Sequence, residues 1–302
     1  MKQKSIRDAF GQELLKVAAK YSNIVVVSAN LAASLRVKEF ARLYPERFFE
    51  VGVAEQNATS VAAGLSLGGK IPFLVSFACF SPYLTFGQIR QSICLNKTNV
   101  KIIGSHAGLS TGPDGAVHQA LEDIALMRAL PKMKVFSPLD FNETKKIVRS
   151  LAKIDGPCYL RLSRPPTSVY PSHPFKTGEA QILKRGSKMS LVGHGPLLAE
   201  TINYFKRELA GVEIINCPTL KPLDKNRIAH SAGKTKKIIT LEDHQIIGGL
   251  GSAVAEIIAE NKINARLIRI GMPDKFGQSA RDYKELWEKY YWQPLKQALD
   301  QD

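Results

Sequence analysis

The segment VGVAEQN places a carboxylate, Glu55, between an apolar strand-like run and a run of small residues typical of a helix. This position predicts that Glu55 is buried at the start of the helix. A carboxyl group held in an apolar site has a raised pKa, so it can share a proton with a bound base. The alternative is a carboxylate that complements the helix dipole, which is the more common role for an isolated Glu there.

Three aromatic residues at a spacing of three, Phe77, Phe80 and Tyr83, begin where the apolar run IPFLVSF ends. If that run is a strand, the aromatic rings lie at its carboxyl end, where open α/β sheets bind ligands. Rings in this place could form the wall of a site for a flat ligand. The alternative is a stripe of core residues, which is the more frequent use of isolated aromatic side chains.

The segment GSHAGLSTGPDGAVHQ carries three side chains that can donate or accept protons, namely His106, Asp114 and His118. Its glycines and Pro113 predict a loop between a strand and a helix. Imidazole suits proton transfer or hydrogen bonding near pH 7. The alternatives are a helix cap at Asp114 and purely structural histidines.

The elements that must position these residues follow from the apolar pattern. Strand-like runs alternate with helix-sized segments, which predicts parallel sheets covered by helices on both faces. In the first part of the chain the predicted strands lie within residues 23–30, 47–53, 71–77, 100–106, 133–138 and 158–163. A second set lies within residues 189–195, 212–218, 236–243 and 265–271. The predicted fold is therefore α/β, with two three-layer α/β/α domains and mostly parallel sheets.

A proline-rich segment, RPPTSVYPSHPF, separates the two sets of strands. Proline disfavours both a helix interior and a central strand, so an interdomain linker is expected here. A length of 302 residues with 44% hydrophobic content is sufficient for two domains, each with a core of its own.

The net charge of +15 is the unusual feature of the composition. Lysine and arginine are spread along the chain rather than gathered in a patch with a nucleic-acid-binding motif. We therefore expect an anionic small-molecule substrate or an acidic partner, and no nucleic acid.

Neither a secretory signal nor a membrane span is evident, so a cytoplasmic protein without a membrane partner is expected. The four cysteines, Cys79, Cys94, Cys158 and Cys217, lie in apolar contexts without a CxxC pair. This pattern predicts reduced core thiols rather than disulfides or a metal site.

Four motifs stand in the order in which they occur in the transketolase family: AEQN, the FxxFxxY spacing, HxGxxxGxDGxxHQ and LSRP. The first part of the chain resembles the pyrimidine-binding domain of that family. The second part, with CPTLKPLD and EDHQIIGGLGSAVAE, resembles its C-terminal domain. The resemblance implies a pyrimidine-binding domain over residues 1–168, a linker over 169–185 and a C-terminal domain over 186–302.

The resemblance implies a site for thiamine diphosphate. Glu55 matches the glutamate that binds N1′ of the aminopyrimidine ring, and His118 matches a histidine near the reacting hydroxyls. Phe80 would stack on the pyrimidine, with Phe77 and Tyr83 as walls. The expected activity is reversible transfer of a two-carbon ketol unit between a ketose phosphate and an aldose phosphate. The implied catalytic residues are Glu55 and His118.

The resemblance also implies a sugar-phosphate site. Its residues would be Arg7, Ser34, His106, Asp114, His118 and Arg164. Arginine guanidinium groups suit a phosphate because they can bind two of its oxygens. Arg161 is expected to point to the opposite side of its strand. Two positions depart from the family pattern, Asn30 beside the cofactor and Pro113 before the DG pair.

The family binds the diphosphate and its Mg²⁺ or Ca²⁺ through GDG followed by Asn about 25–30 residues later, and this pair is absent from the sequence. We therefore expect no metal ligand on this chain. It is expected to be the C-terminal subunit of a split transketolase, with a separate N-terminal subunit that carries GDG and Asn. An α2β2 assembly is expected.

Three alternatives remain at this point. 1-Deoxyxylulose-5-phosphate synthase shares several of the motifs, but His106 and the chain length favour a transketolase. The β subunit of a 2-oxoacid dehydrogenase has a similar size, but a different glutamate context and a paired-histidine loop are expected there. The third alternative is a non-catalytic homologue.

Overall fold

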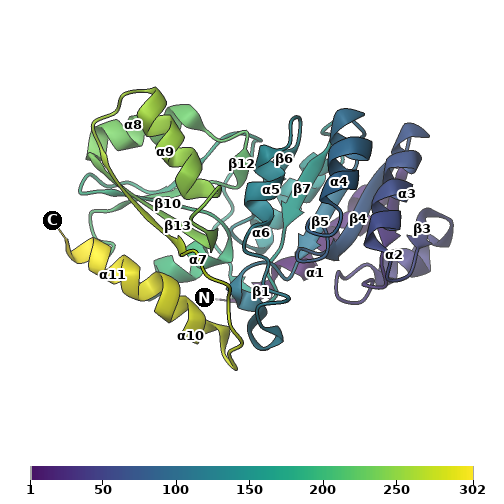
Figure 1. Cartoon of the computed structure of the whole chain (residues 1–302), viewed down its shortest axis with the longest axis horizontal. Coiled ribbons are helices and arrows are strands. Elements are labelled where there is room, and N and C mark those ends of the chain that lie inside the picture. Colours follow the sequence, from purple (N-terminus) through teal and green to yellow (C-terminus); the bar gives the residue numbers. More distant parts are fainter. Residues whose placement is uncertain (1, 302) are drawn as a thin grey trace.

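The computed structural model describes residues 2–301, which form two large open sheets that lie side by side and one short two-stranded sheet. The earlier part of the chain forms the larger sheet, on the right of Figure 1, and the later part forms the smaller sheet on the left. In the described chain no helix has both the length and the apolar character that a membrane crossing requires.

From residue 2 onward, the described first part of the chain contains eight strands and six α-helices, with three short helices of other types between them. The strands are β1 (Gln3–Ser5), β2 (Ile24–Ser28), β3 (Phe48–Glu50), β4 (Ile71–Phe77), β5 (Lys101–Ser105), β6 (Lys134–Phe136), β7 (Cys158–Arg161) and β8 (Pro166–Ser168). The helices are α1 (Ile6–Lys20), α2 (Lys38–Leu43), η1 (Pro45–Arg47), α3 (Glu55–Leu67), α4 (Phe86–Gln88), η2 (Ile89–Leu95), η3 (Leu109–Asp114), α5 (Asp123–Ala129) and α6 (Phe141–Leu151).

The second part follows the same alternation. Its strands are β9 (Gln181–Lys184), β10 (Ser190–Gly193), β11 (Glu213–Asn216), β12 (Thr219–Lys221), β13 (Lys237–Gln245) and β14 (Arg266–Met272). Its helices are α7 (Gly195–Tyr204), α8 (Lys225–Thr235), α9 (Leu250–Glu260), α10 (Tyr283–Trp287), η4 (Glu288–Trp292) and α11 (Gln293–Asp300).

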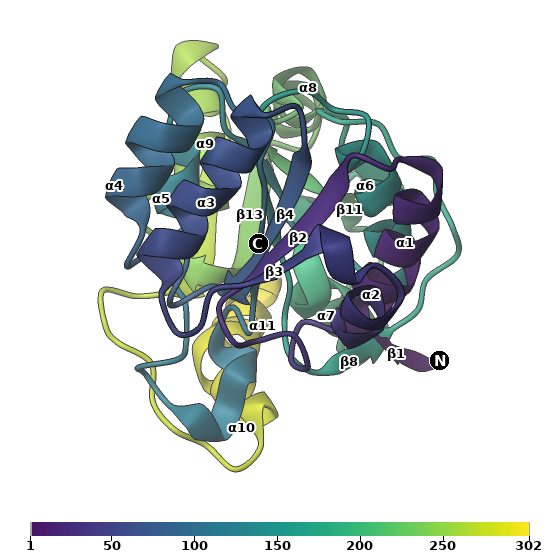
Figure 2. The same ribbon diagram turned by 90° about the vertical axis from the view of Figure 1, so that its right-hand side faces the viewer.

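The larger sheet has the order β12-β6-β7-β5-β4-β2-β3, and all of its neighbours are parallel except β12 and β6. Side chains alternate along its buried strands, so neighbouring residues enter different cores. Val27 and Leu74 pack with α3 and α5, whereas Val26 and Phe73 pack with α1 and α6. Figure 2 shows α3, α4 and α5 on one side of this sheet and α1 and α6 on the other. The predicted three-layer arrangement is confirmed.

The smaller sheet has the order β14-β13-β10-β11-β9, with only β9 antiparallel to its neighbour. Leu191 and Ile239 face α7 and α11 in one core. Val192 and Ile238 face α8 and α9 in another. The second predicted domain is therefore also a helix–sheet–helix sandwich.

Two strands depart from the predicted division of the chain. β9 lies within the residues taken as linker, yet it pairs with β11 at the edge of the smaller sheet. β12 lies in the second part of the sequence but pairs with β6 of the larger sheet. Both are short antiparallel edge strands without a long apolar run, which is why the alternation pattern does not reveal them. The short pairing of β1 with β8 was not predicted either.

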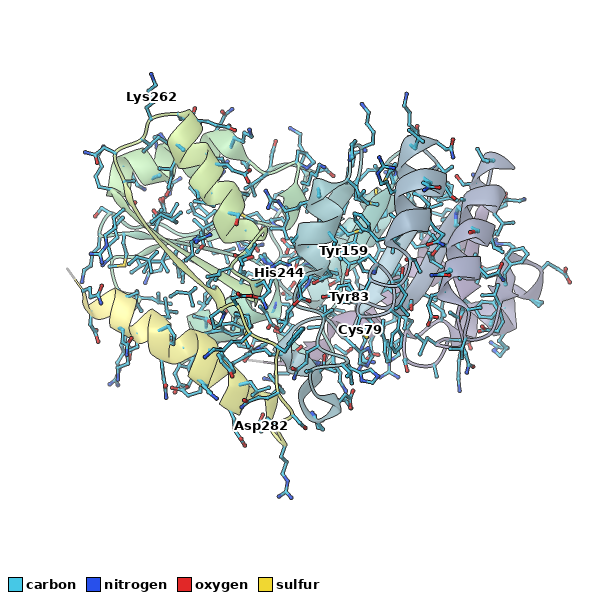
Figure 3. All side chains as sticks on the ribbon, viewed as in Figure 1. Cys79, Tyr83, Tyr159, His244, Lys262 and Asp282 are labelled. Carbon is cyan, nitrogen blue, oxygen red and sulfur yellow. The ribbon has the colours of Figure 1, made fainter. Side chains whose placement is uncertain are left out.

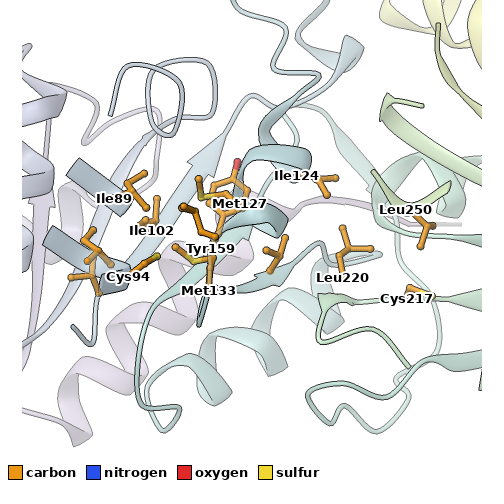
Figure 4. Close-up of a cluster of buried hydrophobic side chains, with 14 of the residues drawn as sticks. Ile89, Cys94, Ile102, Ile124, Met127, Met133, Tyr159, Cys217, Leu220 and Leu250 are labelled. Atoms are coloured by element: carbon orange, nitrogen blue, oxygen red, sulfur yellow. The ribbon is translucent and has the colours of Figure 1, made fainter. Parts of the chain in front are cut away.

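A continuous apolar core joins the two parts. Figure 4 shows Ile124 and Met127 of the first part in the same cluster as Leu220 and Leu250 of the second. All four cysteines are buried and free, as the sequence predicts.

Candidate active site

The candidate residues meet at the carboxyl ends of the parallel strands. Phe77 is the last residue of β4, His106 follows β5, and Arg164 lies three residues beyond the end of β7. Glu55 begins α3, which follows β3. Since parallel strands end at the same edge of the sheet, segments far apart in the sequence converge there, as in other open α/β sheets.

Glu55 occupies the first turn of α3, and its helix has no side-chain cap at Ala54. The carboxylate has no hydrogen-bond partner among residues 2–301, and the residue is only partly buried. The prediction of a buried Glu55 is therefore wrong for this chain alone. The physical reason is its place at the open edge of the sheet, where a helix start has protein on one side only. An unpaired carboxylate at this edge is accessible to a ligand.

Two of the three aromatic rings stack on each other. The ring centroids of Phe77 and Phe80 are 5.7 Å apart, with 19° between the ring planes. Cys79 is buried beside them, and burial raises the pKa of its thiol to about 12. Since Phe80 is partly exposed, its ring can contact a ligand. Figure 3 labels Cys79 and Tyr83, which belong to the same small apolar cluster.

Tyr83 is held by Glu122 through two hydrogen bonds. Its hydroxyl donates to the Glu122 carboxylate at 2.5 Å and accepts from the Glu122 backbone N–H at 2.8 Å. Burial, with the nearby acidic groups, raises the pKa of Tyr83, so the hydroxyl stays protonated. Sequence reasoning did not single out Glu122, and only its place four residues after His118 would have indicated it.

Both predicted histidines lie against the aromatic pair. The His106 ring is 3.9 Å from the Phe77 ring, and the His118 ring meets Phe80 edge-on at 5.6 Å between centroids. Nδ1 of His118 is buried without a hydrogen-bond partner in the described chain. Since a buried unpaired nitrogen is costly, a ligand that bonds to His118 would relieve that cost.

Arg7 and Arg164 form a basic cluster beside His106. The guanidinium of Arg7 donates to the carbonyl oxygens of Ser34 at 2.9 Å and Arg164 at 3.0 Å. Arg164 in turn donates to the carbonyl of Thr111 at 2.8 Å and lies 3.4 Å from the carboxylate of Asp114. The predicted residues Arg7, Ser34, Asp114 and Arg164 are thus brought together.

The electrostatics of this cluster favour an anion. Burial, followed by the charges of Arg7 and Arg164, lowers the pKa of His106 to about 3, so this imidazole is neutral at pH 7. Burial and the nearby Arg36 lower the pKa of Arg7. A negatively charged group would compensate both effects.

Arg161 lies outside this cluster, in agreement with its predicted orientation. It is buried, and its guanidinium donates to the Asp123 carboxylate at 2.8 Å and to the Asp243 carbonyl at 2.8 Å. Although burial alone would lower the pKa of Arg161, Asp123 and Asp243 raise it.

The two departures from the family pattern are located at the surface. Asn30 has a φ of 59°, and its N–H donates to the Glu50 carboxylate at 2.7 Å. Pro113 is exposed, and its carbonyl accepts a hydrogen bond from Ser279 at 2.7 Å. Glu50 and Ser279 were not identified from the sequence.

The chain is an α/β protein whose larger, mostly parallel sheet carries an unpaired carboxylate, aromatic side chains and a basic cluster at its carboxyl edge. These groups are chemically suited to an aromatic, anionic ligand. Residues 2–168 match the family model of the transketolase pyrimidine binding domain, and residues 178–294 match that of the transketolase C-terminal domain. The chain belongs to the transketolase family.

Three relatives indicate the range of this similarity. A transketolase C-terminal section of Methanocaldococcus jannaschii is 41% identical, over 95% of this chain and 92% of its own length. A 6-deoxy-6-sulfo-D-fructose transketolase subunit of a Clostridium species is 37% identical, over 90% of this chain and 86% of its own length. The 1-deoxy-D-xylulose-5-phosphate synthase of Caldanaerobacter subterraneus is 33% identical, over 95% of this chain and 46% of its own length.

A solved structure gives the same result. A split-gene transketolase, described as an inactive β4 tetramer, matches with a TM-score of 0.88 and 39% identity, over 99% of this chain and 97% of that one.

The family implies thiamine diphosphate, and the residues present suit its aminopyrimidine end. An unpaired carboxylate, a partly exposed phenylalanine and a tyrosine fixed by Glu122 are suitable groups for a flat heterocycle with ring nitrogens. Within residues 2–301 no three His, Cys, Asp or Glu side chains gather in a way that could hold a metal ion.

Proposed function

We propose that this chain is the C-terminal subunit of a split transketolase, which transfers a two-carbon ketol unit between sugar phosphates. The observation that carries the proposal is the meeting of Glu55, the Phe77–Phe80 pair and the Arg7–Arg164 cluster at one sheet edge. The first two suit thiamine, and the third suits a phosphate. A relative and a solved structure of similar length carry names of the same kind.

Each residue has a role in this proposal. Bound thiamine diphosphate supplies the nucleophilic carbon and the electron sink for cleavage of a carbon–carbon bond. Glu55 would hold a proton at N1′ of the aminopyrimidine, and Phe80 would exclude water from one ring face. Phe77 and Tyr83 would fix the orientation of the ring from its sides.

The substrate residues divide by charge and donor type. Arg7 and Arg164 would bind the phosphate group, with Ser34 and neutral His106 beside them. Asp114 would accept a hydrogen bond from a sugar hydroxyl. His118, whose Nδ1 is unpaired, would donate or accept a proton at the reacting oxygens.

We further propose a separate N-terminal subunit that binds the diphosphate and its Mg²⁺ or Ca²⁺, in an α2β2 assembly. Four exposed apolar side chains lie on and around α3 and α4: Val53 (77% exposed), Leu67 (72%), Leu84 (56%) and Leu95 (73%). Exposed leucines on adjacent helices are typical of a surface that is covered in an assembly.

The experiment is co-expression with a separately encoded N-terminal subunit that contains GDG and Asn. The purified complex, supplied with thiamine diphosphate and Mg²⁺, should transfer two carbons from xylulose 5-phosphate to ribose 5-phosphate. The isolated chain should not. Turnover by the isolated chain would contradict the split-subunit proposal.

The alternative enzymes would require other substrates and would be inactive in this assay. A 1-deoxyxylulose-5-phosphate synthase would condense pyruvate with glyceraldehyde 3-phosphate, and a 2-oxoacid dehydrogenase β subunit would act on a 2-oxoacid. A non-catalytic homologue would show neither reaction. The two-arginine cluster favours a sugar phosphate over a simple 2-oxoacid.

A further inference from the structure

The loop that carries Asp114 and His118 has a backbone that needs external support. Residues 108–119, here called the substrate loop, include Gly108, Gly112 and Gly115, with φ values of 80°, 67° and 72°. Glycine adopts such angles without strain, but it also leaves the unbound loop with many alternative conformations. Something must therefore hold the loop if its side chains are to keep one position.

The C-terminal domain holds the start of the loop. The Leu109 N–H donates to the Asp243 carboxylate at 2.9 Å, and the Tyr291 hydroxyl donates to the same oxygen at 2.9 Å. The backbone of Gly108 also lies directly against the Asp243 side chain, since a Cβ atom at residue 108 would lie 2.1 Å from Asp243 Oδ2. The contact is buried, since Asp243 is 5% exposed and Leu109 is fully buried.

The middle and the end of the loop are held by a second segment of that domain. Residues 275–281, here called the brace segment, lie between β14 and α10. Ser279 Oγ donates to the Pro113 carbonyl at 2.7 Å, and the Ala280 N–H donates to the Gly112 carbonyl at 3.4 Å. At the other end, the Gln119 amide donates to the Gln278 carbonyl at 2.9 Å.

Gly277 sets how closely the two segments approach. A Cβ atom at this residue would lie 1.9 Å from Oε1 of Gln119, next in sequence to His118. Gln119 is itself 3% exposed, so its side chain has little space into which it could move. A larger residue at 277 would therefore displace Gln119 and break its bond to Gln278.

We propose that the brace segment positions the substrate loop, with Gly277 and Ser279 as positioning residues for His118 and Asp114. The expected effect on the reaction rests on the proposed function. The contact between the two segments does not depend on it. Such positioning gives the C-terminal domain an indirect role in substrate binding, through the substrate loop, although none of the proposed sugar-phosphate residues lies in that domain.

The first test measures the loop without the reaction. Gly277→Ala and Ser279→Ala should each speed amide hydrogen–deuterium exchange in residues 108–119, by about tenfold in the full chain. Gly233→Ala is the matched control, because a Cβ there meets nothing within 4 Å and its φ is ordinary. If amide exchange in the substrate loop stayed at the wild-type rate in both variants, the proposal would be overturned.

The second test measures the consequence in the complex with the N-terminal subunit. Gly277→Ala and Ser279→Ala should lower kcat/KM for the sugar phosphates about tenfold, with half-saturation by thiamine diphosphate within about twofold of wild type. Ser279→Thr keeps the hydroxyl and should restore kcat/KM. If a variant complex showed faster exchange in the substrate loop but kept the wild-type kcat/KM, the positioning role would be overturned. A wild-type complex without ketol transfer would instead contradict the proposed function, and the exchange result would still decide on the contact.

Discussion

At the scale of the residue, the surroundings decide what each ionisable side chain can do. His106 and His118 lie against the same pair of phenylalanines, yet their surroundings differ. His106 has a hydrogen bond to Ser105 at 2.8 Å and a pKa lowered to about 3 by burial and nearby arginines. It can therefore act as a neutral hydrogen-bonding group at pH 7 but not as an acid. His118, with a free Nδ1, is the better candidate for proton transfer.

Replacement of Glu55 by Gln tests the catalytic role of the carboxylate. Gln keeps the size and one hydrogen-bonding oxygen but cannot hold the proton at N1′. We expect hydrogen–deuterium exchange at C2 of bound thiamine to slow by about two orders of magnitude or more in the complex. The melting temperature should hardly change.

A Glu55 that only complements the helix dipole predicts the reverse. Exchange at C2 would then stay at the wild-type rate, and the free energy of unfolding would fall by about 0.5–1 kcal/mol. Measuring exchange and a thermal melt on the same preparations separates the two roles.

Tyr83→Phe removes the hydroxyl that joins Tyr83 to Glu122. Both the Glu122 N–H and one carboxylate oxygen lose a partner, so the free energy of unfolding should fall by about 1 kcal/mol. The ring would also lose its fixed orientation, and the complex should bind thiamine diphosphate roughly threefold to tenfold less tightly. Calorimetric titration of the complex with thiamine diphosphate measures the change in affinity. Tyr44→Phe is the control, because the Tyr44 ring packs under Arg47 outside the site, and equal effects in both variants would contradict a role for the Glu122 contact.

At the scale of the element, helix α6 shows how a helix start can join two domains. Asp140 caps the helix by accepting from the Glu143 N–H at 2.8 Å. The Glu143 carboxylate accepts from the Leu139 N–H at 2.6 Å and from Asn216 of β11 at 2.9 Å. One buried carboxyl group thus contacts both the helix start and the smaller sheet.

This carboxyl group should make the stability depend on pH. Burial raises the pKa of Glu143 from 4.5 to about 7, despite its hydrogen bonds. The folded chain therefore keeps this proton between pH 4.5 and 7, where the unfolded chain has lost it. Since folding then favours the protonated form, the contribution of Glu143 to stability falls as the pH rises through this window.

Glu143→Gln removes that dependence. Relative to the variant, the wild-type chain should lose roughly 3 kcal/mol of unfolding free energy between acidic and neutral pH. Urea unfolding at several pH values measures the difference. Glu256→Gln is the control, because the Glu256 side chain is exposed. The unfolding free energy of this variant should change with pH in the same way as that of the wild-type chain. If the unfolding free energies of the wild-type chain and Glu143→Gln differed by the same amount at every pH between acidic and neutral, the raised pKa of Glu143 would be contradicted.

The elements differ in how well the sequence predicts them. Long apolar runs such as IPFLVSF coincide with β4, because a strand buried on both faces needs apolar residues throughout. β9 and β12 have three or four residues at sheet edges, and their pairing depends on distant partners rather than on their own pattern. Motif order indicated the residues of the candidate site. Glu122, Asp243 and Ser279 were missed because their roles come from contacts across the fold.

At the scale of the whole molecule, the exposed apolar side chains around α3 and α4 should direct assembly. We expect Leu95→Asp to block association of this chain with itself or with the N-terminal subunit, because it places a charge on an apolar surface. Light scattering measures the mass. Leu43→Asp is the control, since Leu43 is also exposed but lies on α2, which packs with the opposite core. An assembly unaffected by Leu95→Asp would place the interface elsewhere.

The pairing of β12 with β6 has a consequence for the chain during its synthesis. The edge of β6 stays unpaired until Lys221 has been made, which is 60 residues after the end of β7 at Arg161, since 221 − 161 = 60. At roughly 5–20 residues per second, a ribosome needs about 3–12 seconds for that stretch. An open strand edge is a template for pairing with other chains. The nascent protein thus has an open edge on its larger sheet until β12 of the second domain has been made, and a chain cut within the proline-rich segment would keep that edge open.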